Sequence, residues 1–267
     1  MLKVLLYLIA IYLIFLLFLY LVQRQLIYFP ESFAPSPAEA GVPEMQVVEL
    51  QTSDGLILKA WYRRPTNPLL PTLVYFHSNA GHIGYRAGIV KPFLNEGYGV
   101  LLLTYRGYSG NPGKPYEEGL YTDARAAMEF LKREGFVDQR TVLYGNSIGA
   151  AVAIQIATEY PVGAIVLQSP FTSLADVGQY HYPLFPVKWF VKDKFNSMTK
   201  REGIDVPIFI LHGNDDRIIP PMFSRQLFEA LPEPKHIEYI PNRGHNDLFE
   251  PELVIRFINE QVIENQE

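Results

Sequence analysis

The sequence predicts an α/β fold, with a mainly parallel β-sheet, helices on both faces, a short cap insertion and a transmembrane helix in front. From residue 72 onward, segments of strand and helix character alternate, which is typical of parallel strands joined by crossover helices. Two β-like runs on either side of Ser53-Asp54-Gly55 precede them and indicate a leading antiparallel hairpin. An apolar run occupies the amino terminus.

That apolar run, Val4–Val22, lies between Lys3 and Gln23-Arg24-Gln25. As a helix it is about 28 Å long, close to the thickness of a bilayer's hydrocarbon core. A cleaved signal peptide is the competing interpretation, but such peptides usually have a shorter apolar core and a small-residue cleavage site. The sequence therefore favours a retained anchor over residues 1–25. The basic residues lean slightly toward a cytoplasmic amino terminus and an external or periplasmic main domain.

The rest of the chain is expected to be a linker over residues 26–44, proline-rich from residue 30, and one domain over 45–267. Within the domain, short runs rich in branched and aromatic residues predict strands, and the longer segments between turn residues predict helices. The expected strands are 45–52, 56–63, 72–77, 99–105, 141–145, 163–168, 206–212 and 236–240. The expected helices are 84–96, 116–134, 147–160, 221–231 and 251–262.

The segment Gly145-Asn146-Ser147-Ile148-Gly149 lies between an apolar strand and an Ala-rich helix. A strand, a sharp turn at serine and a helix form the nucleophile elbow of an α/β hydrolase. Glycine is wanted on both sides because a Cβ there would collide with neighbouring backbone. The pattern predicts an α/β-hydrolase fold with Ser147 as its nucleophile.

A serine nucleophile needs a base, and the base needs a group to orient it. Of the six histidines, His245 follows the last expected strand at the carboxyl edge of the sheet. His77 and His212 end strands at that edge as well, where structural hydrogen bonds are the simpler interpretation. The acid is expected after the strand 206–212, where Asp215 and Asp216 are adjacent and the residues alone do not choose between them. The order serine, acid, histidine is that of an α/β hydrolase.

The tetrahedral intermediate of acyl transfer needs two backbone N–H donors. Ile148, directly after the nucleophile, supplies one at the start of a helix. The loop after the strand 72–77 should supply the other, and we assign it to Asn79.

Residues 171–204 break the alternation of strands and helices and form the expected cap. Two interpretations of its aromatic rings stay open: they shield a lipophilic substrate at the pocket mouth, or they pack the cap onto the core. The rings are Phe171, Tyr180, Tyr182, Phe185, Trp189, Phe190 and Phe195.

The composition excludes several classes of function. The net charge of −5 and the lack of a Lys/Arg cluster argue against a nucleic-acid partner. The chain has no cysteine, which excludes disulfides, thiolate metal sites and a cysteine nucleophile. No Walker loop or His-Glu-x-x-His motif is present, so no cofactor and no metal are expected. The oligomeric state is left open.

Several motifs resemble, in the same order, those of the Bem-like serine hydrolases, which are related to animal membrane-associated palmitoyl-protein thioesterases. The similar segments are 76–84, 105–110, the elbow, 169–173 and 244–247, and the resemblance covers Leu26 to Phe249. It implies an α/β-hydrolase fold and selects Asp216 as the acid, through the pattern Gly-x-x-Asp-x-x-Ile/Val-Pro. Ser78 stands where the family carries glycine, which bears on how Asn79 presents its N–H.

Together, the residues and the resemblance predict a membrane-anchored serine hydrolase that cleaves carboxylic esters or thioesters of lipophilic acyl groups. The expected partners are a small-molecule or lipid acyl ester and a membrane. The alternatives are a serine peptidase of the same fold and a non-catalytic membrane scaffold.

Overall fold

The computed structural model describes residues 1–136 and 139–264. The main sheet has the strands β2 (Gln46–Gln51), β3 (Ile57–Arg63), β4 (Thr72–Phe76), β6 (Gly99–Leu102), β7 (Thr141–Asn146), β8 (Ala164–Gln168), β9 (Ile208–Gly213) and β10 (Lys235–Ile240). A separate two-stranded pair consists of β1 (Phe29–Pro30) and β5 (Ala80–Gly81). The helices are α1 (Leu2–Ile27), α2 (Ala87–Asn95), α3 (Glu117–Glu134), α4 (Ile148–Ala157), α5 (Leu174–His181), α6 (Val187–Phe190), α7 (Pro221–Ala230) and α8 (Pro251–Ile258). Short helical turns cover Ile83–Arg86, Arg201–Gly203 and Asn259–Ile263.

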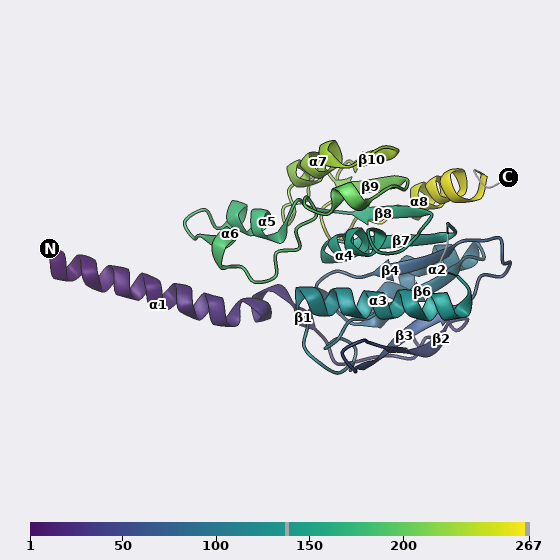
Figure 1. Ribbon diagram of the computed structural model, residues 1–267, viewed down its shortest axis with the longest axis horizontal. Coiled ribbons are helices and arrows are strands. Elements are labelled where there is room, and N and C mark those ends of the chain that lie inside the picture. The colour runs from purple at the N-terminus through teal and green to yellow at the C-terminus, as the bar shows by residue number, and fades with distance from the viewer. Residues whose placement is uncertain (137–138, 265–267) are drawn as a thin grey trace.

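The main sheet confirms the expected fold class. Its strand order is β10-β9-β8-β7-β4-β6-β3-β2, parallel from β10 through β6 and antiparallel where β3 pairs with β6 and β2. The hairpin predicted around Ser53-Asp54-Gly55 is therefore the β2–β3 edge of the sheet. Because the central strands are parallel, the loops that follow β4, β7, β9 and β10 meet at one edge (Figure 1). These loops and the first residue of α4 carry every predicted site residue.

Helices cover both faces of the sheet, as the alternation predicted. In β4, Val74 and Phe76 pack into a core with α3, α4 and α7, whereas Leu73 and Tyr75 pack into a second core with α2 and α8. Successive side chains of a strand point to opposite faces. The resulting three-layer arrangement is visible in Figure 1.

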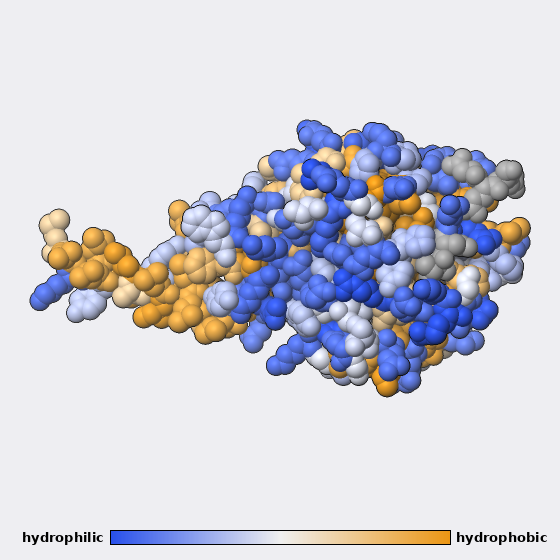
Figure 2. Space-filling view, in the orientation of Figure 1, coloured by the Kyte–Doolittle hydropathy of each residue, from blue (hydrophilic) through white to orange (hydrophobic). Residues whose placement is uncertain are grey.

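The helix α1 projects from the domain (Figure 1), and its surface is hydrophobic where the domain is largely hydrophilic (Figure 2). It is long and apolar enough to cross a membrane, and none of its residues is buried. It is the candidate membrane-spanning segment of this chain.

The segment between α1 and the hairpin does not hang free. β1 pairs with β5 in parallel, Phe29 beside Ala80, and the side chains of Val42 and Met45 are buried in the core that α2 and α8 cover. The linker predicted over residues 26–44 is thus attached to the domain near both of its ends. The domain boundaries themselves stay predictions.

The rings of the predicted cap divide into two groups. Phe171 and Phe195 are buried in the core, as the packing interpretation requires. Tyr182, Trp189 and Phe190 are exposed instead, and the ring of Phe190 in α6 meets that of Tyr20 in α1.

Candidate active site

Ser147 lies at a strained turn between β7 and α4. Its backbone has φ 55° and ψ −115°, a region that non-glycine residues rarely occupy and that concentrates at functional sites. A Cβ on Gly145 would overlap the carbonyl of Gly149, and a Cβ on Gly149 would overlap the carbonyl of Phe76. Both glycines are therefore required for the turn, for the steric reason that the sequence suggested.

Asp216 and His245 come together from the loops after β9 and β10. His245 Nδ1 lies 2.7 Å from Asp216 Oδ2, and the two side chains are almost fully buried. The other carboxylate oxygen, Oδ1, accepts hydrogen bonds from the N–H groups of Ile218 at 2.9 Å and Ile219 at 2.8 Å. The acid is thus held by its own loop, and it fixes the orientation of the imidazole.

Burial alone would raise the pKa of Asp216, but hydrogen bonds from His212 and His245 outweigh it and hold the pKa well below its usual range. The carboxylate is therefore negative at neutral pH. A negative partner keeps the proton of the imidazole on Nδ1 and leaves Nε2 free to accept another.

Asp215 lies outside this pair. It is exposed, and its backbone N–H donates to the carbonyl of Arg243 at 2.9 Å. That bond joins the loop of the acid to the loop of the histidine. The structure brings Asp216, not Asp215, to His245, in agreement with the choice that the resemblance implied.

Gln168, which sequence reasoning missed, connects the serine to the histidine loop. Its carbonyl accepts the N–H of Ser147 at 2.8 Å. Its side chain accepts the hydroxyl of Tyr144 at 2.7 Å and donates to the carbonyl of Leu248, three residues after His245, at 2.9 Å. Among the described residues, the Ser147 hydroxyl has no hydrogen-bond partner, and in particular none to His245. Such bonds often tighten only once a substrate is bound.

His212 is a second residue with a contact to the acid that the sequence did not reveal. The sequence suggested a structural hydrogen bond, and its buried Nε2–H does donate to the carbonyl of Ile219 at 2.8 Å. The same nitrogen lies 3.3 Å from Asp216 Oδ2. Only its place at the end of β9, four residues before the acid, hinted at this contact.

The loop after β4 carries Asn79, the expected oxyanion donor. Its side-chain amide donates to the carbonyl of Ile27 at 2.7 Å, and its own carbonyl accepts Phe29 N–H at 2.8 Å and the Tyr108 hydroxyl at 2.6 Å. Within residues 1–136 and 139–264, no acceptor is recorded for the N–H of Asn79 or for that of Ile148. Both amides are thus available to an oxyanion.

His77 supports the same loop from inside the protein. Its Nδ1–H donates to the carbonyl of Ser78 at 2.6 Å, and its Nε2 accepts the N–H of Tyr105 at 3.4 Å. Burial, with a smaller effect from the positive charge of Arg86, lowers the pKa of His77 to about 3. The ring is therefore neutral and structural, as the sequence suggested.

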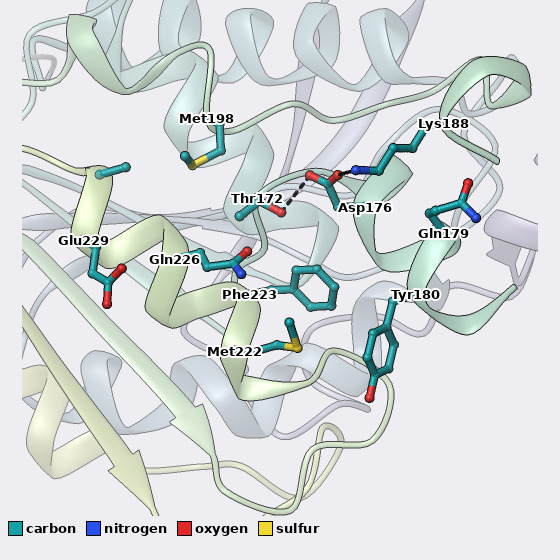
Figure 3. Close-up of a pocket in the computed structure, with 11 residues that line it drawn as sticks. Thr172, Asp176, Gln179, Tyr180, Lys188, Met198, Met222, Phe223, Gln226 and Glu229 are labelled. Atoms are coloured by element: carbon teal, nitrogen blue, oxygen red, sulfur yellow. Dashed lines mark hydrogen bonds and ion pairs between the residues drawn. The ribbon is translucent and has the colours of Figure 1, made fainter. Parts of the chain in front are cut away.

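A cavity of about 730 Å³ lies between the cap and α7 (Figure 3). Lys188 forms an ion pair of 2.6 Å with Asp176 there, and Thr172 donates to the same carboxylate at 2.9 Å. The hydroxyl and amide side chains, with Phe223 and two methionines, make a mixed lining. Ser147, Asp216 and His245 are not among the lining residues. The cavity adjoins the acid loop through His181 at the end of α5, whose Nε2–H donates to the carbonyl of Ile218 at 2.9 Å.

In the part of the chain that the structure describes, no group of three or more His, Cys, Asp or Glu side chains is placed to hold a metal ion.

Known proteins share this sequence and fold. The sequence matches the family described as serine aminopeptidase, S33, over residues 69–199 and 189–252. An uncharacterized protein of Mycobacterium tuberculosis is 40% identical, covering 89% of this chain and 84% of its own length. The protein bem46 of Schizosaccharomyces pombe is 32% identical, covering 89% and 85%. An uncharacterized membrane protein of Saccharomyces cerevisiae is 32% identical, covering 86% and 84%.

Among solved structures, an esterase of Pyrococcus furiosus superposes with a TM-score of 0.72 at 21% identity, covering 88% of this chain and 100% of its own. That likeness shows the α/β-hydrolase fold. The family match covers more than half of the chain, and bem46 matches most of it, which makes this protein a hydrolase. The chain therefore belongs to the serine aminopeptidase S33 family of α/β hydrolases and to the Bem-like proteins within that fold.

Proposed function

We propose that the protein is a membrane-anchored serine hydrolase that cleaves carboxylic esters or thioesters of lipophilic acyl groups, with Ser147, His245 and Asp216 as its triad. One observation carries the proposal above the others. The imidazole of His245 is oriented by a buried, negatively charged Asp216 at the sheet edge where the strained Ser147 ends β7.

In the acylation step, His245 Nε2 takes the proton of the Ser147 hydroxyl as the Oγ attacks the carbonyl carbon of the substrate. The carbonyl π electrons move to its oxygen. The N–H groups of Asn79 and Ile148 donate to that oxyanion, and each such donor typically stabilises the transition state by about 3 kcal/mol.

To complete acylation, His245 Nε2–H gives its proton to the leaving alcohol or thiol as the bond between carbonyl carbon and leaving group breaks. This leaves an acyl-enzyme on Ser147. A water molecule then attacks the ester carbon while His245 accepts its proton, and the imidazole returns that proton to Ser147 Oγ as the carboxylic acid departs. No cofactor takes part in acylation or in deacylation.

The membrane anchor in this proposal is α1. Its support is that no residue of the apolar helix is buried against the domain, and that a relative of similar length is described as a membrane protein. We further propose that the main domain is external or periplasmic. Because the chain has no cysteine, a single Ser53→Cys variant in intact cells tests this. Labelling by a membrane-impermeant maleimide supports an external domain, and labelling only after lysis places it inside.

A substrate panel tests the activity. Para-nitrophenyl esters and acyl thioesters of rising chain length should be hydrolysed by the wild type and not by Ser147→Ala. Ser53→Ala, which changes an exposed serine in the β2–β3 turn, is the matched control and should retain full activity. Equal turnover by Ser147→Ala and the wild type would refute the nucleophile assignment. No turnover by the wild type would favour the non-catalytic scaffold.

A second candidate is a peptidase, and one observation favours it: the matched family is described as serine aminopeptidase. The same triad can cleave amides. Comparing kcat/KM for aminoacyl para-nitroanilides with that for acyl esters separates the two, and a higher value for the anilides selects the peptidase.

A further inference from the structure

The segment 182–190, here called the cap tip, is strongly apolar and exposed. Leu184 is 85% exposed and Trp189 is 83% exposed, and the side chains of Tyr182 and Phe190 are exposed as well. Its single charged residue, Lys188, turns back to Asp176 in the cavity (Figure 3). Apolar surface of this kind usually marks an interaction site.

The cap tip lies directly along α1. The hydroxyl of Tyr12 donates to the carbonyl of Leu184 at 3.1 Å, and its ring stacks on Phe185 with centroids 6.1 Å apart. Nearer the domain, the rings of Tyr20 and Phe190 meet edge to face at 6.4 Å. In Figure 2 the hydrophobic surface gathers at this end of the molecule.

The polar side chains at the carboxyl-terminal end of α1 indicate where the surface of a bilayer would lie. Arg24 donates to both oxygens of Asp193 at 3.0 Å, and Gln23 accepts the N–H of Lys192 at 2.7 Å. From Arg24 back to Tyr12 the helix rises by about 18 Å. If the hydrocarbon core begins beside Val22, Leu184 lies deep in the same leaflet as this half of α1.

Several backbone carbonyls of the cap tip accept hydrogen bonds from side chains of the protein, as a segment inside a bilayer requires. Backbone carbonyls inside a bilayer must find donors within the protein. The side chain of Gln179 donates to Phe185 O at 2.9 Å and to the carbonyls of Tyr182 and Pro183 at 3.4 Å. The carbonyl of Leu184 accepts a hydrogen bond from the Tyr12 hydroxyl. Pro183 and Pro186 have no backbone N–H that would need an acceptor.

We propose that the cap tip inserts into the hydrocarbon of the lipid bilayer beside α1, so that the protein is attached at two points and its cap is held in the membrane. The inference rests on the proposed anchoring by α1. Acyl chains fit both the exposed apolar side chains of the cap tip and the apolar helix α1 that runs next to them.

Tryptophan fluorescence tests this in the full chain, which has only two tryptophans, Trp61 and Trp189. Trp61 is 3% exposed in β3, and Trp61→Phe leaves Trp189 as the sole reporter. In phosphatidylcholine vesicles brominated at mid-chain, this variant should lose most of its emission relative to unbrominated vesicles. Trp189→Phe, with only Trp61 left, should lose little. If Trp61→Phe fails to fold, the wild type compared with Trp189→Phe gives the same information.

Two further reporters, each placed as the only tryptophan, separate the cap tip from the anchor. Phe15→Trp reports α1. Leu69→Trp is the matched control, because Leu69 is 69% exposed but precedes β4, at the opposite edge of the sheet. Quenching of the Phe15 and Trp189 reporters but not of the Leu69 reporter supports the proposal. Quenching of the Phe15 reporter alone overturns it and leaves the anchor intact. A Trp189 that emits at short wavelength without quenching also overturns it, in favour of contact with a second copy. If neither membrane reporter is quenched, both the cap-tip proposal and the anchor fail.

Discussion

The side-chain amide of Asn79 donates a hydrogen bond of 2.7 Å to the carbonyl of Ile27, the last residue of α1. The helix proposed to cross the membrane is thus bonded to the residue proposed to present an oxyanion donor. The parallel β1–β5 pair continues the connection, since it begins two residues after Ile27 and directly after Asn79. Whatever orders the end of α1 therefore also orders this loop.

This relationship predicts the effect of Asn79→Ala. The substitution keeps the backbone N–H but removes the bond to Ile27, so the donor is held less firmly. Because small displacements of a catalytic group are costly, we expect kcat to fall by about tenfold or more, with a smaller change in KM. Asn67→Ala, in the loop before β4 at the far edge of the sheet, is the control and should match the wild type. An unchanged kcat for Asn79→Ala would show that the bond to Ile27 does not position the donor.

Removing the charge of Asp216 and removing that of its neighbour Asp215 should affect kcat very differently. Asp216→Asn keeps the shape of the side chain but removes the charge that orients and stabilises the imidazole, so kcat should fall by about 10³- to 10⁴-fold. Asp215 is exposed and reaches the histidine loop only through its backbone N–H. Asp215→Asn should therefore change kcat by less than about twofold. Steady-state kinetics with one ester substrate decides the matter, and the reverse ranking would reassign the acid.

Gln168 predicts a coupled loss of stability and activity. Gln168→Leu leaves the Tyr144 hydroxyl and the Leu248 carbonyl without their partner in a buried site, which should cost about 1–3 kcal/mol of the free energy of unfolding. It should also lower kcat, since the histidine loop loses a tether. Urea denaturation measures the first effect and ester turnover the second. Gln155→Leu, on the partly exposed side of α4, should cost less than about 0.5 kcal/mol. Equal stabilities of the two variants would mean that Gln168 does not hold the loop.

His77 predicts how stability depends on pH. Its pKa is about 3 in the folded protein, whereas a histidine in an unfolded chain titrates near about 6.5. As the pH falls below that value, the unfolded chain binds a proton that the folded protein does not, so the stabilising contribution is complete above about pH 6.5 and is lost progressively toward pH 3. Thermal denaturation between neutral pH and about pH 5 should show a falling midpoint in the wild type and a flatter dependence in His77→Asn. The control is His236→Asn, which removes an exposed histidine. Parallel curves for His77→Asn and the wild type would contradict this account.

Local patterns were enough to predict the fold and the turn at Ser147. The strands have short apolar runs between turn residues, and the elbow has glycines whose Cβ positions are blocked by backbone. The choice between Asp215 and Asp216 was different, because adjacent residues of one type carry the same local signal. Only the folded loop, or the resemblance to a family, separates them.

Other features depend on contacts between distant segments and leave no local signal. A strand of two residues such as β1 has no periodicity, so its pairing with β5 and the bond from Asn79 to Ile27 were not predictable. The same holds for Gln168, whose partners lie in β7 and the turn after it and in the loop that follows His245. The aromatic residues of the cap were visible in the sequence, but which of them pack and which face outward depends on contacts with distant segments, such as that of Phe195 with Tyr121 in α3.

The central claim is that Ser147 is the nucleophile, and covalent trapping tests it most directly. After reaction of the full chain with a fluorophosphonate, digestion and tandem mass spectrometry should place one adduct on Ser147, absent in Ser147→Ala and formed more slowly in Asp216→Asn. An adduct on another serine, or equal labelling of Ser147→Ala and the wild type, would contradict the account.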